Sequence, residues 1–218
     1  MILVRLVAVV AILSAFTGCS DGGYKPCSGD LVFVISSESE FSDAITESTA
    51  ARDSLKFDHV AIVALEHDVA YVIEASPRYG VVMRTLDDFL KEVPLSQGRY
   101  GVVFKRLTAD SCKGICMSEV IENAKRYIGE EYDWFFMHDN GRQYCSELVY
   151  NSFILPDGEH VFSAEPMNFR SEDGTMPLFW VQLYERLGVA IPEGEPGTNP
   201  GKMSKADFLE EVCRFPKY

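Results

Sequence analysis

The chain has 218 residues, of which 20 are Lys or Arg and 33 are Asp or Glu, so its formal net charge is −13 at pH 7. This acidic balance argues against nucleic acid and against anionic lipid surfaces as partners, because both carry negative charge. The length is enough for one domain with a sizeable hydrophobic core.

The first residues have the pattern of a secretory signal. One basic residue, Arg5, precedes an apolar run over residues 6–16 that is too short to span a bilayer. The following Phe16-Thr17-Gly18-Cys19 resembles the lipobox of bacterial lipoproteins, which implies cleavage after residue 18 and lipid attachment to Cys19. We therefore expect a lipoprotein signal peptide over residues 1–18 and a lipid anchor to a bacterial membrane, either the outer membrane or the periplasmic face. The alternatives are an uncleaved anchor and a chance apolar start.

Residues 19–28 form a predicted tether, and residues 29–218 form a single predicted domain. Hydrophobic periodicity and turn residues predict the elements of this domain in chain order. They are strand 31–35, helix 37–51, strands 59–65 and 69–75, strand 80–84, helix 85–90, strand 100–107, helix 118–128, a helix that begins at Cys145, helix 178–187, loop 191–201 and, after Ser204 as N-cap, helix 205–212. This order indicates an α+β fold in which helices pack against an antiparallel sheet.

Cys145 lies where a loop turns into an apolar helix, in Tyr144-Cys145-Ser146-Glu147. The unpaired N–H groups and the dipole at a helix N-terminus stabilise a thiolate, which is the form of cysteine that attacks carbonyl carbon. Upstream, His59 starts a strand and Glu74 lies in the next one. A cysteine, a histidine and a polar group that orients the histidine are the minimum set for nucleophilic acyl chemistry.

A hairpin between these two strands predicts how His59 and Glu74 meet. If Glu66 and His67 form the turn, His59 lies directly opposite Glu74 on one face of the hairpin. The carboxylate would then hold the imidazole by its second nitrogen. A change of one residue in the loop would break this register.

The remaining cysteines, Cys27, Cys112, Cys116 and Cys213, leave disulfide pairing open outside the cytoplasm. Cys112 and Cys116 have no second Cys or His pair at zinc-finger spacing, and the four histidines show no spacing typical of a catalytic metal. We expect neither a metal nor a cofactor.

Several segments together resemble a known family. They are Gly29-Asp30-Leu31-Val32-Phe33, Asp58-His59-Val60-Ala61-Ile62, Glu74-Ala75, Gly129 with Tyr132-Asp133, and Tyr144-Cys145-Ser146-Glu147-Leu148-Val149. Their order resembles the YiiX/YebB-like group of circularly permuted papain-like cysteine hydrolases, within the NlpC-type superfamily, in which the histidine precedes the cysteine. The resemblance implies an α+β permuted papain-like fold, with an antiparallel sheet or partial barrel packed with helices.

The resemblance also implies roles for individual residues. Cys145 would be the nucleophile, His59 the base and later the acid, and Glu74 the third polar residue. The backbone N–H of Cys145 and one donor among Gln143, Tyr144 and Tyr132 would bind the oxyanion. Tyr132, Asp133 and Tyr144 are the predicted substrate-binding residues, although Tyr132-Asp133 is equally suited to anchoring the loop before the nucleophile.

These residues predict a cell-envelope cysteine hydrolase that cleaves amide bonds in a small peptide or acyl-amide substrate, with murein-derived peptides as the first candidates. Membrane contact would come through the N-terminal lipid. Two alternatives remain open. One is a lipid-anchored module that binds a peptide, an amino acid or an acyl chain, and the other is an acyltransferase that works close to the membrane.

Overall fold

The computed structural model describes residues 24–36, 39–49, 55–93, 95–96 and 99–215. The predicted signal peptide and the lipidation residue Cys19 lie outside the described residues. Among the helices of the described part, none is long and apolar enough to cross a membrane.

A six-stranded antiparallel sheet forms the centre of the molecule, with the strand order β10-β7-β1-β2-β3-β4. Its strands are β1 (Leu31–Ile35), β2 (Phe57–Glu66), β3 (Val69–Ser76), β4 (Gly80–Thr85), β7 (Val102–Leu107) and β10 (Leu209–Phe215). Two short pairs are separate from it: β5 (Leu95–Ser96) with β6 (Arg99–Tyr100), and β8 (Glu165–Pro166) with β9 (Pro196–Gly197).

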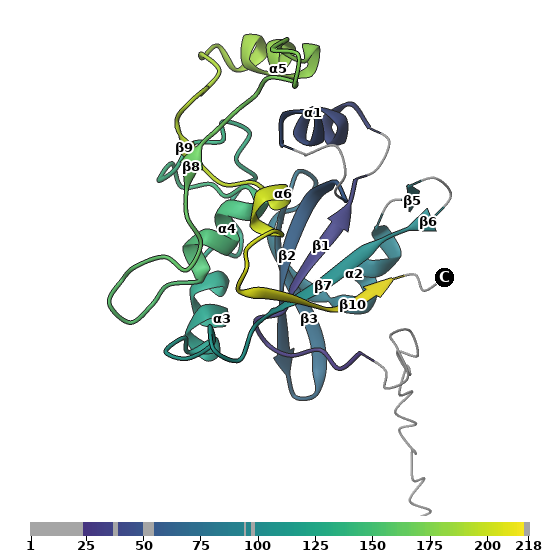
Figure 1. The fold of residues 1–218 in the computed structure, drawn as a ribbon, viewed down its shortest axis with the longest axis vertical. Helices are drawn as coiled ribbons and strands as arrows, with labels where there is room; N and C mark the ends of the chain where they lie inside the picture. The colour runs from purple at the N-terminus through teal and green to yellow at the C-terminus, as the bar shows by residue number, and fades with distance from the viewer. Residues whose placement is uncertain (1–23, 37–38, 50–54, 94, 97–98, 216–218) are drawn as a thin grey trace, which may run out of the picture.

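The described residues also form six helices, which pack around this sheet. They are α1 (Glu40–Thr49), α2 (Leu86–Glu92), α3 (Met117–Lys125), α4 (Cys145–Ser152), α5 (Leu178–Leu187) and α6 (Pro200–Met203). Figure 1 shows α3 and α4 next to each other on one side of the sheet, with α1 and α5 together at one end. The predicted α+β class is confirmed, and helix 178–187 has the predicted bounds.

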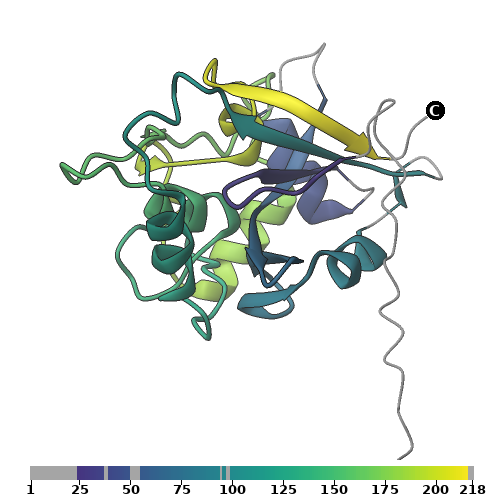
Figure 2. The same ribbon diagram turned by 90° about the horizontal axis from the view of Figure 1, so that it is seen from below.

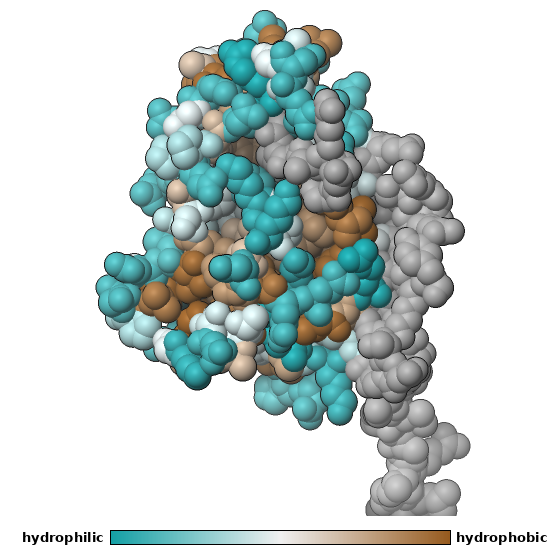
Figure 3. Space-filling model, in the orientation of Figure 1, coloured by the Kyte–Doolittle hydropathy of each residue, from teal (hydrophilic) through white to brown (hydrophobic). Residues whose placement is uncertain are grey.

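Both faces of the sheet are covered, and the alternation of side chains along each strand separates two hydrophobic clusters. Phe33 and Ile62 belong to the larger cluster, which also holds residues of α3, α4 and α5. Val32 and Val63 belong to the smaller cluster, which includes Phe89 of α2. Because both faces of the sheet are covered, the sequences of these strands are continuously apolar and do not alternate with polar residues. In the view of Figure 3, hydrophobic residues gather in the middle of the face and hydrophilic ones lie around them.

The predicted final helix over residues 205–212 is wrong. Residues Leu209–Phe215 form β10, which pairs with β7 and runs along the outer edge of the sheet in Figure 2. Ser204 does not start a helix, since its hydroxyl donates to the carbonyl of Gly201 at the end of α6. Leu209 and Cys213 are buried while Glu210 is exposed, so pairing with the free edge of β7 outweighs the local helical pattern.

Gly80 marks a close approach between β4 and the loop after α3. Its φ is +67°, and a Cβ at this position would lie 2.3 Å from the carbonyl oxygen of Glu130. That carbonyl accepts a hydrogen bond from the N–H of Val81, so the loop is held against the strand. A side chain at position 80 would force the two segments apart.

We expect Gly80→Ala to lower the free energy of unfolding by about 2–4 kcal/mol, because backbone strain and a steric clash add up. Gly114→Ala is the matched control, since Gly114 also has a positive φ, +95°, but no atom lies within 4 Å of its Cβ position. This control would lose only the backbone term of about 1–2 kcal/mol. Urea unfolding of both variants checks the difference, and equal losses would contradict the close approach.

Candidate active site

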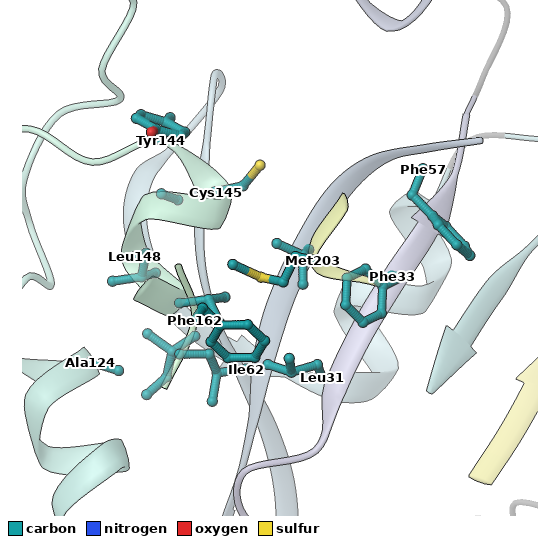
Figure 4. Close-up of a cluster of buried hydrophobic side chains, with 14 of the residues drawn as sticks. Leu31, Phe33, Phe57, Ile62, Ala124, Tyr144, Cys145, Leu148, Phe162 and Met203 are labelled. Atoms are coloured by element: carbon teal, nitrogen blue, oxygen red, sulfur yellow. The ribbon is translucent and has the colours of Figure 1, made fainter. Parts of the chain in front are cut away.

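Cys145 is the first residue of α4, and Tyr144 before it has the extended backbone of an N-cap residue. The carboxylate of Glu147 accepts a hydrogen bond from the N–H of Tyr144 at 3.4 Å, which fixes the chain where the helix begins. Figure 4 shows Tyr144 and Cys145 at this first turn, and Leu148 one turn further into the core. The thiol therefore lies at the positive end of the helix dipole, although only 4% of Cys145 is exposed.

His59 of β2 and Glu74 of β3 form a partly buried pair, with 2.7 Å between Nε2 of His59 and Oε2 of Glu74. Glu74 is only 2% exposed. Since Nε2 is occupied by Glu74, Nδ1 is the ring nitrogen available to the Cys145 thiol. The structure thus brings together the three residues predicted to carry out the chemistry.

The surroundings of His59 favour its charged form. Burial alone would lower the pKa of His59, but hydrogen bonds to Cys145 and Glu74 and the negative charges of both groups raise it to about 10. The imidazole is therefore held in its cationic form between the Cys145 thiol and the carboxylate of Glu74. A cationic imidazole next to a cysteine favours the thiolate form that acts as a nucleophile.

The predicted hairpin register is wrong, although the predicted contact forms. The turn is made by His67 and Asp68, both at positive φ (49° and 65°), and not by Glu66 and His67. Two positive φ values are the requirement of a type I′ hairpin turn. The register differs from the predicted one by two residues, which leaves His59 and Glu74 on the same face.

His59 and Glu74 lie just beyond the end of the β2–β3 ladder, whose last pair at this end is Ile62 with Ile73. The helix α4 packs against β2 and β3 on the face of the larger cluster. Side chains alternate between the two faces along a strand, and by this alternation His59 and Glu74 belong to the opposite face, that of the smaller cluster. The thiol and the imidazole therefore meet at the point where the two strands no longer pair.

Two pockets lie on either side of this meeting point. The aromatic pocket is lined by Cys145 and, among others, Ile45, Phe136, Met167, Phe169 and Trp180, and has a cavity volume of about 60 Å³. The polar pocket is lined by His59 and Glu74 and, among others, Asp58, Arg78, Arg84 and Glu92. Tyr132 lines both, so its ring stands at the junction between the pockets.

Comparison with known proteins agrees with this geometry. Residues 25–213 match the model of a family described as permuted papain-like amidase enzymes, YaeF/YiiX, C92 family. The chain belongs to this family. The order of His59 before Cys145 is the order expected of its permuted members, and the predicted family and fold are confirmed.

Two relatives, one compared by sequence and one by structure, agree with this assignment. The uncharacterized protein YiiX of Escherichia coli K12 is 28% identical over 207 residues, which are 93% of this chain and 94% of that protein. The crystal structure of metalloprotein yiiX from Escherichia coli O157:H7 superposes with a TM-score of 0.66 at 26% identity, and covers 89% of this chain and 100% of that one. That E. coli protein is described as a metalloprotein. In the described part of this chain, no three His, Cys, Asp or Glu side chains group so as to hold a metal ion.

The predicted substrate-binding residues have different surroundings. Tyr132 lines both pockets, and Tyr144 lines the aromatic pocket while its hydroxyl accepts a hydrogen bond from the N–H of Thr198 at 3.1 Å. Asp133 is fully buried, and its two carboxylate oxygens accept hydrogen bonds from the N–H groups of Phe135 and Met137. These two contacts fit the second reading, in which Asp133 anchors the loop before the nucleophile.

Sequence reasoning missed a pair of residues beneath the nucleophile. Glu147 is fully buried, and Nδ1 of His138 lies 3.0 Å from its Oε1. Burial is the main cause that raises the pKa of Glu147, and the contact with Glu147 is the main cause that raises the pKa of His138. Only 23% of the His138 side chain is exposed, although the residue lies in a polar stretch of the sequence.

The cysteines outside the site do not form the bridges considered from the sequence. Cys27, Cys112 and Cys116 carry free thiols, so no disulfide joins any of them to one another or to Cys213. Cys116 is exposed, and hydrogen bonds from Ser118 and the following backbone lower the pKa of its thiol.

Arg84 is a further residue that the sequence did not identify. Its Nε donates to Oε1 of Glu74 at 2.7 Å, and its Nη1 donates to Glu92, also at 2.7 Å. In the β3–β4 ladder Glu74 pairs with Val82, so Arg84 is the next residue on the same face of the sheet. If the register of the β3–β4 hairpin had been assigned from its turn at residues 77–79, Arg84 would have been placed near Glu74.

Loss of Arg84 should shift the pH dependence of the thiol. Burial raises the pKa of Glu74, but the His59 contact and the Arg84 guanidinium outweigh burial and keep the pKa below its ordinary value. In Arg84→Gln the pKa of Glu74 rises, the carboxylate gains a proton at mildly acidic pH, and the imidazolium of His59 loses its support. We expect the acid limb of Cys145 alkylation by iodoacetamide to move to higher pH, with about tenfold slower labelling near pH 5.

Arg84→Lys keeps the charge and should fall between the wild type and Arg84→Gln. Arg214→Gln is the matched control, because Arg214 pairs with Glu211 on the edge strand β10 and lines neither pocket. An unchanged acid limb in Arg84→Gln would contradict a positioning role for the guanidinium.

Proposed function

We propose that this protein hydrolyses amide bonds with Cys145 as nucleophile, His59 as general base and then general acid, and Glu74 as the group that orients His59. The observation that carries the proposal is the 2.7 Å contact between His59 and the buried Glu74, next to a cysteine at a helix N-terminus. Membership of a family of permuted papain-like amidases supports the reaction class.

The chemistry proceeds in two steps. His59 takes the Cys145 proton, the thiolate attacks the carbonyl carbon, and the C–N bond breaks as His59 returns the proton to the leaving amine. The acyl group is then held as a thioester on Cys145. His59 removes a proton from water, the resulting hydroxide displaces the thiolate, and the carboxylic acid leaves.

Tyr132 is the side chain we propose as the donor to the oxyanion, together with the backbone N–H of Cys145. Tyr132 is 6% exposed and stands at the junction of the two pockets, where the scissile bond must lie. Of the other two candidates, the amide of Gln143 donates to Glu130 at 3.4 Å, and the hydroxyl of Tyr144 accepts a hydrogen bond from the N–H of Thr198 but lines only the aromatic pocket.

Two readouts separate hydrolysis from the alternatives. An acyltransferase would pass the acyl group of the thioester to an added amine or alcohol in preference to water, and product analysis would detect that acyl product. A binding module would bind a peptide or an acyl ligand without turnover. Murein-derived peptides belong in the first substrate panel, because the predicted location is the cell envelope.

We expect iodoacetamide to alkylate Cys145 rapidly at pH 6 in the wild type and at least about a hundredfold more slowly in His59→Ala, because the imidazolium stabilises the thiolate. Peptide mass spectrometry follows Cys145 and the exposed Cys116 in the same sample, and Cys116 serves as the internal control that His59→Ala leaves unchanged. Tyr132→Phe should keep the rapid alkylation and lose about a hundredfold in amide turnover. Equal, slow labelling of Cys145 in wild type and His59→Ala would favour the binding module.

We also propose that the chain is a lipoprotein anchored through Cys19, with residues 1–18 as its signal peptide, because the lipobox and the length of the apolar run agree. In a bacterial host that processes lipoproteins, the protein should incorporate labelled palmitate and partition with membranes. Cys19→Ser should abolish both. Incorporation that persists in this variant would contradict the proposal.

A further inference from the structure

His138 lies in the loop before α4 and contacts the first turn of that helix. Its Nδ1 is 3.0 Å from Oε1 of Glu147, which follows Cys145 by two residues. The other oxygen of the same carboxylate accepts the hydrogen bond from the N–H of Tyr144. Glu147 therefore joins the loop at His138 to the residue directly before the nucleophile.

The backbone of this loop is constrained on both sides of His138. Phe136 and Asp139 have φ values of +52° and +58°, in the left-handed region that side chains other than glycine rarely adopt. The buried carboxylate of Asp133 supports this conformation, because it accepts hydrogen bonds from the N–H groups on either side of Phe136. A conformation of this kind is costly and persists where the surrounding structure imposes it, typically at functional sites.

Aromatic rings fix the orientation of the His138 imidazole. Its centroid lies 5.5 Å from that of Tyr150 and 6.5 Å from that of Tyr144, and both of these residues flank the first turns of α4. Tyr150 in turn stacks on His160, with 3.8 Å between the ring centroids. The contact of His138 with Glu147 is thus held in place by packing as well as by charge.

The charged groups around this contact favour a cationic histidine. The contact with Glu147 is the main cause that raises the pKa of His138, and the carboxyls of Asp139 and Asp133 act in the same direction. The phenol of Tyr127, which follows α3, also faces Glu147, and burial raises its pKa, so that it stays neutral. His138 therefore supplies the positive charge that opposes the carboxyl of Glu147.

Without this partner the buried carboxyl would weaken the start of the helix in either of its protonation states. If Glu147 stayed ionised, its unpaired charge would oppose the thiolate of Cys145 in the same turn. If burial kept it protonated, it would be a weaker acceptor for the N–H of Tyr144, because hydrogen bonds to a charged acceptor are the stronger ones.

We propose that His138 is a positioning residue for the nucleophile, which acts through Glu147 and keeps its carboxylate paired, so that the first turn of α4 presents Cys145 as a thiolate. This inference deepens the proposed hydrolysis and rests on the role of Cys145 in it. Neither His138 nor Glu147 lines the aromatic or the polar pocket, so the pair acts from the side of α4 that faces away from both.

A double-mutant cycle on the full-length protein tests the action through Glu147, with alkylation of Cys145 by iodoacetamide at pH 6 as the readout. His138→Phe keeps a ring against Tyr150 but removes the contact with the carboxyl, and we expect labelling about tenfold slower than in the wild type. In the Glu147→Gln background the same substitution should change the rate less than twofold, since no carboxyl then needs a partner. Equal slowing in both backgrounds, or no slowing in the first, would overturn the proposal.

A conservative variant and a matched control separate positioning from a general loss of structure. His138→Asn keeps an N–H donor near the position of Nδ1 and should label Cys145 within about threefold of the wild-type rate. His160→Phe is the matched control, because it makes the same exchange at the other histidine that contacts Tyr150, and it should leave the rate unchanged. Labelling of Cys116 in the same samples is the internal standard, and urea unfolding establishes that each variant is folded. Labelling as slow in His138→Asn or His160→Phe as in His138→Phe would contradict the proposal.

Failure of this inference can be distinguished from failure of the proposed function. If Cys145 is alkylated rapidly in the wild type and equally rapidly in His138→Phe, the positioning role is wrong and the thiol mechanism stands. If Cys145 is alkylated as slowly in the wild type as in His59→Ala, the proposed hydrolysis fails and this inference fails with it.

Discussion

The site depends on one buried carboxylate, that of Glu74. A carboxylate that is only 2% exposed is expensive to keep charged unless it is paired, and here each of its oxygens lies 2.7 Å from a cationic partner, His59 or Arg84. This double pairing lowers the pKa of Glu74 in spite of burial. It also explains why the imidazole remains protonated in an environment that would otherwise make it neutral.

The fold supplies the place for this pair. A sheet covered on both faces would normally separate groups on one face from groups on the other. The thiol reaches the imidazole because the pairing of β2 with β3 stops at Ile62 and Ile73, short of His59 and Glu74, while α4 packs against these same strands. The end of the ladder is thus what allows a helix on one face and a histidine of the other face to form one site.

Period-two alternation explains why much of this site was predictable although the register was wrong. A hairpin shifted by two residues keeps every side chain on its face, so the contact between His59 and Glu74 survived an incorrect turn. Asp and His tolerate positive φ better than most other residues, but their types do not require it, so the turn at His67 and Asp68 could not be assigned from the sequence alone. The edge strand β10 was missed for a different reason, since its pairing with β7 is a long-range contact that local pattern does not contain. Arg84 and His138 act through partners distant in sequence, and only the folded chain shows those partners.

The pair beneath the nucleophile has an electrostatic consequence for the thiol. Glu147 lies in the first turn of α4, where an unpaired carboxylate would oppose the negative charge that forms on Cys145 in the same turn. His138 at 3.0 Å provides the compensating positive charge, and the raised pKa of His138 is the direction this pairing requires. When Glu147 is ionised, the pair adds no net charge below the helix; when burial keeps it protonated, the carboxyl is neutral by itself. In both states Glu147 can fix the helix start through Tyr144, while the dipole of α4 and the charge of His59 act on the Cys145 sulfur.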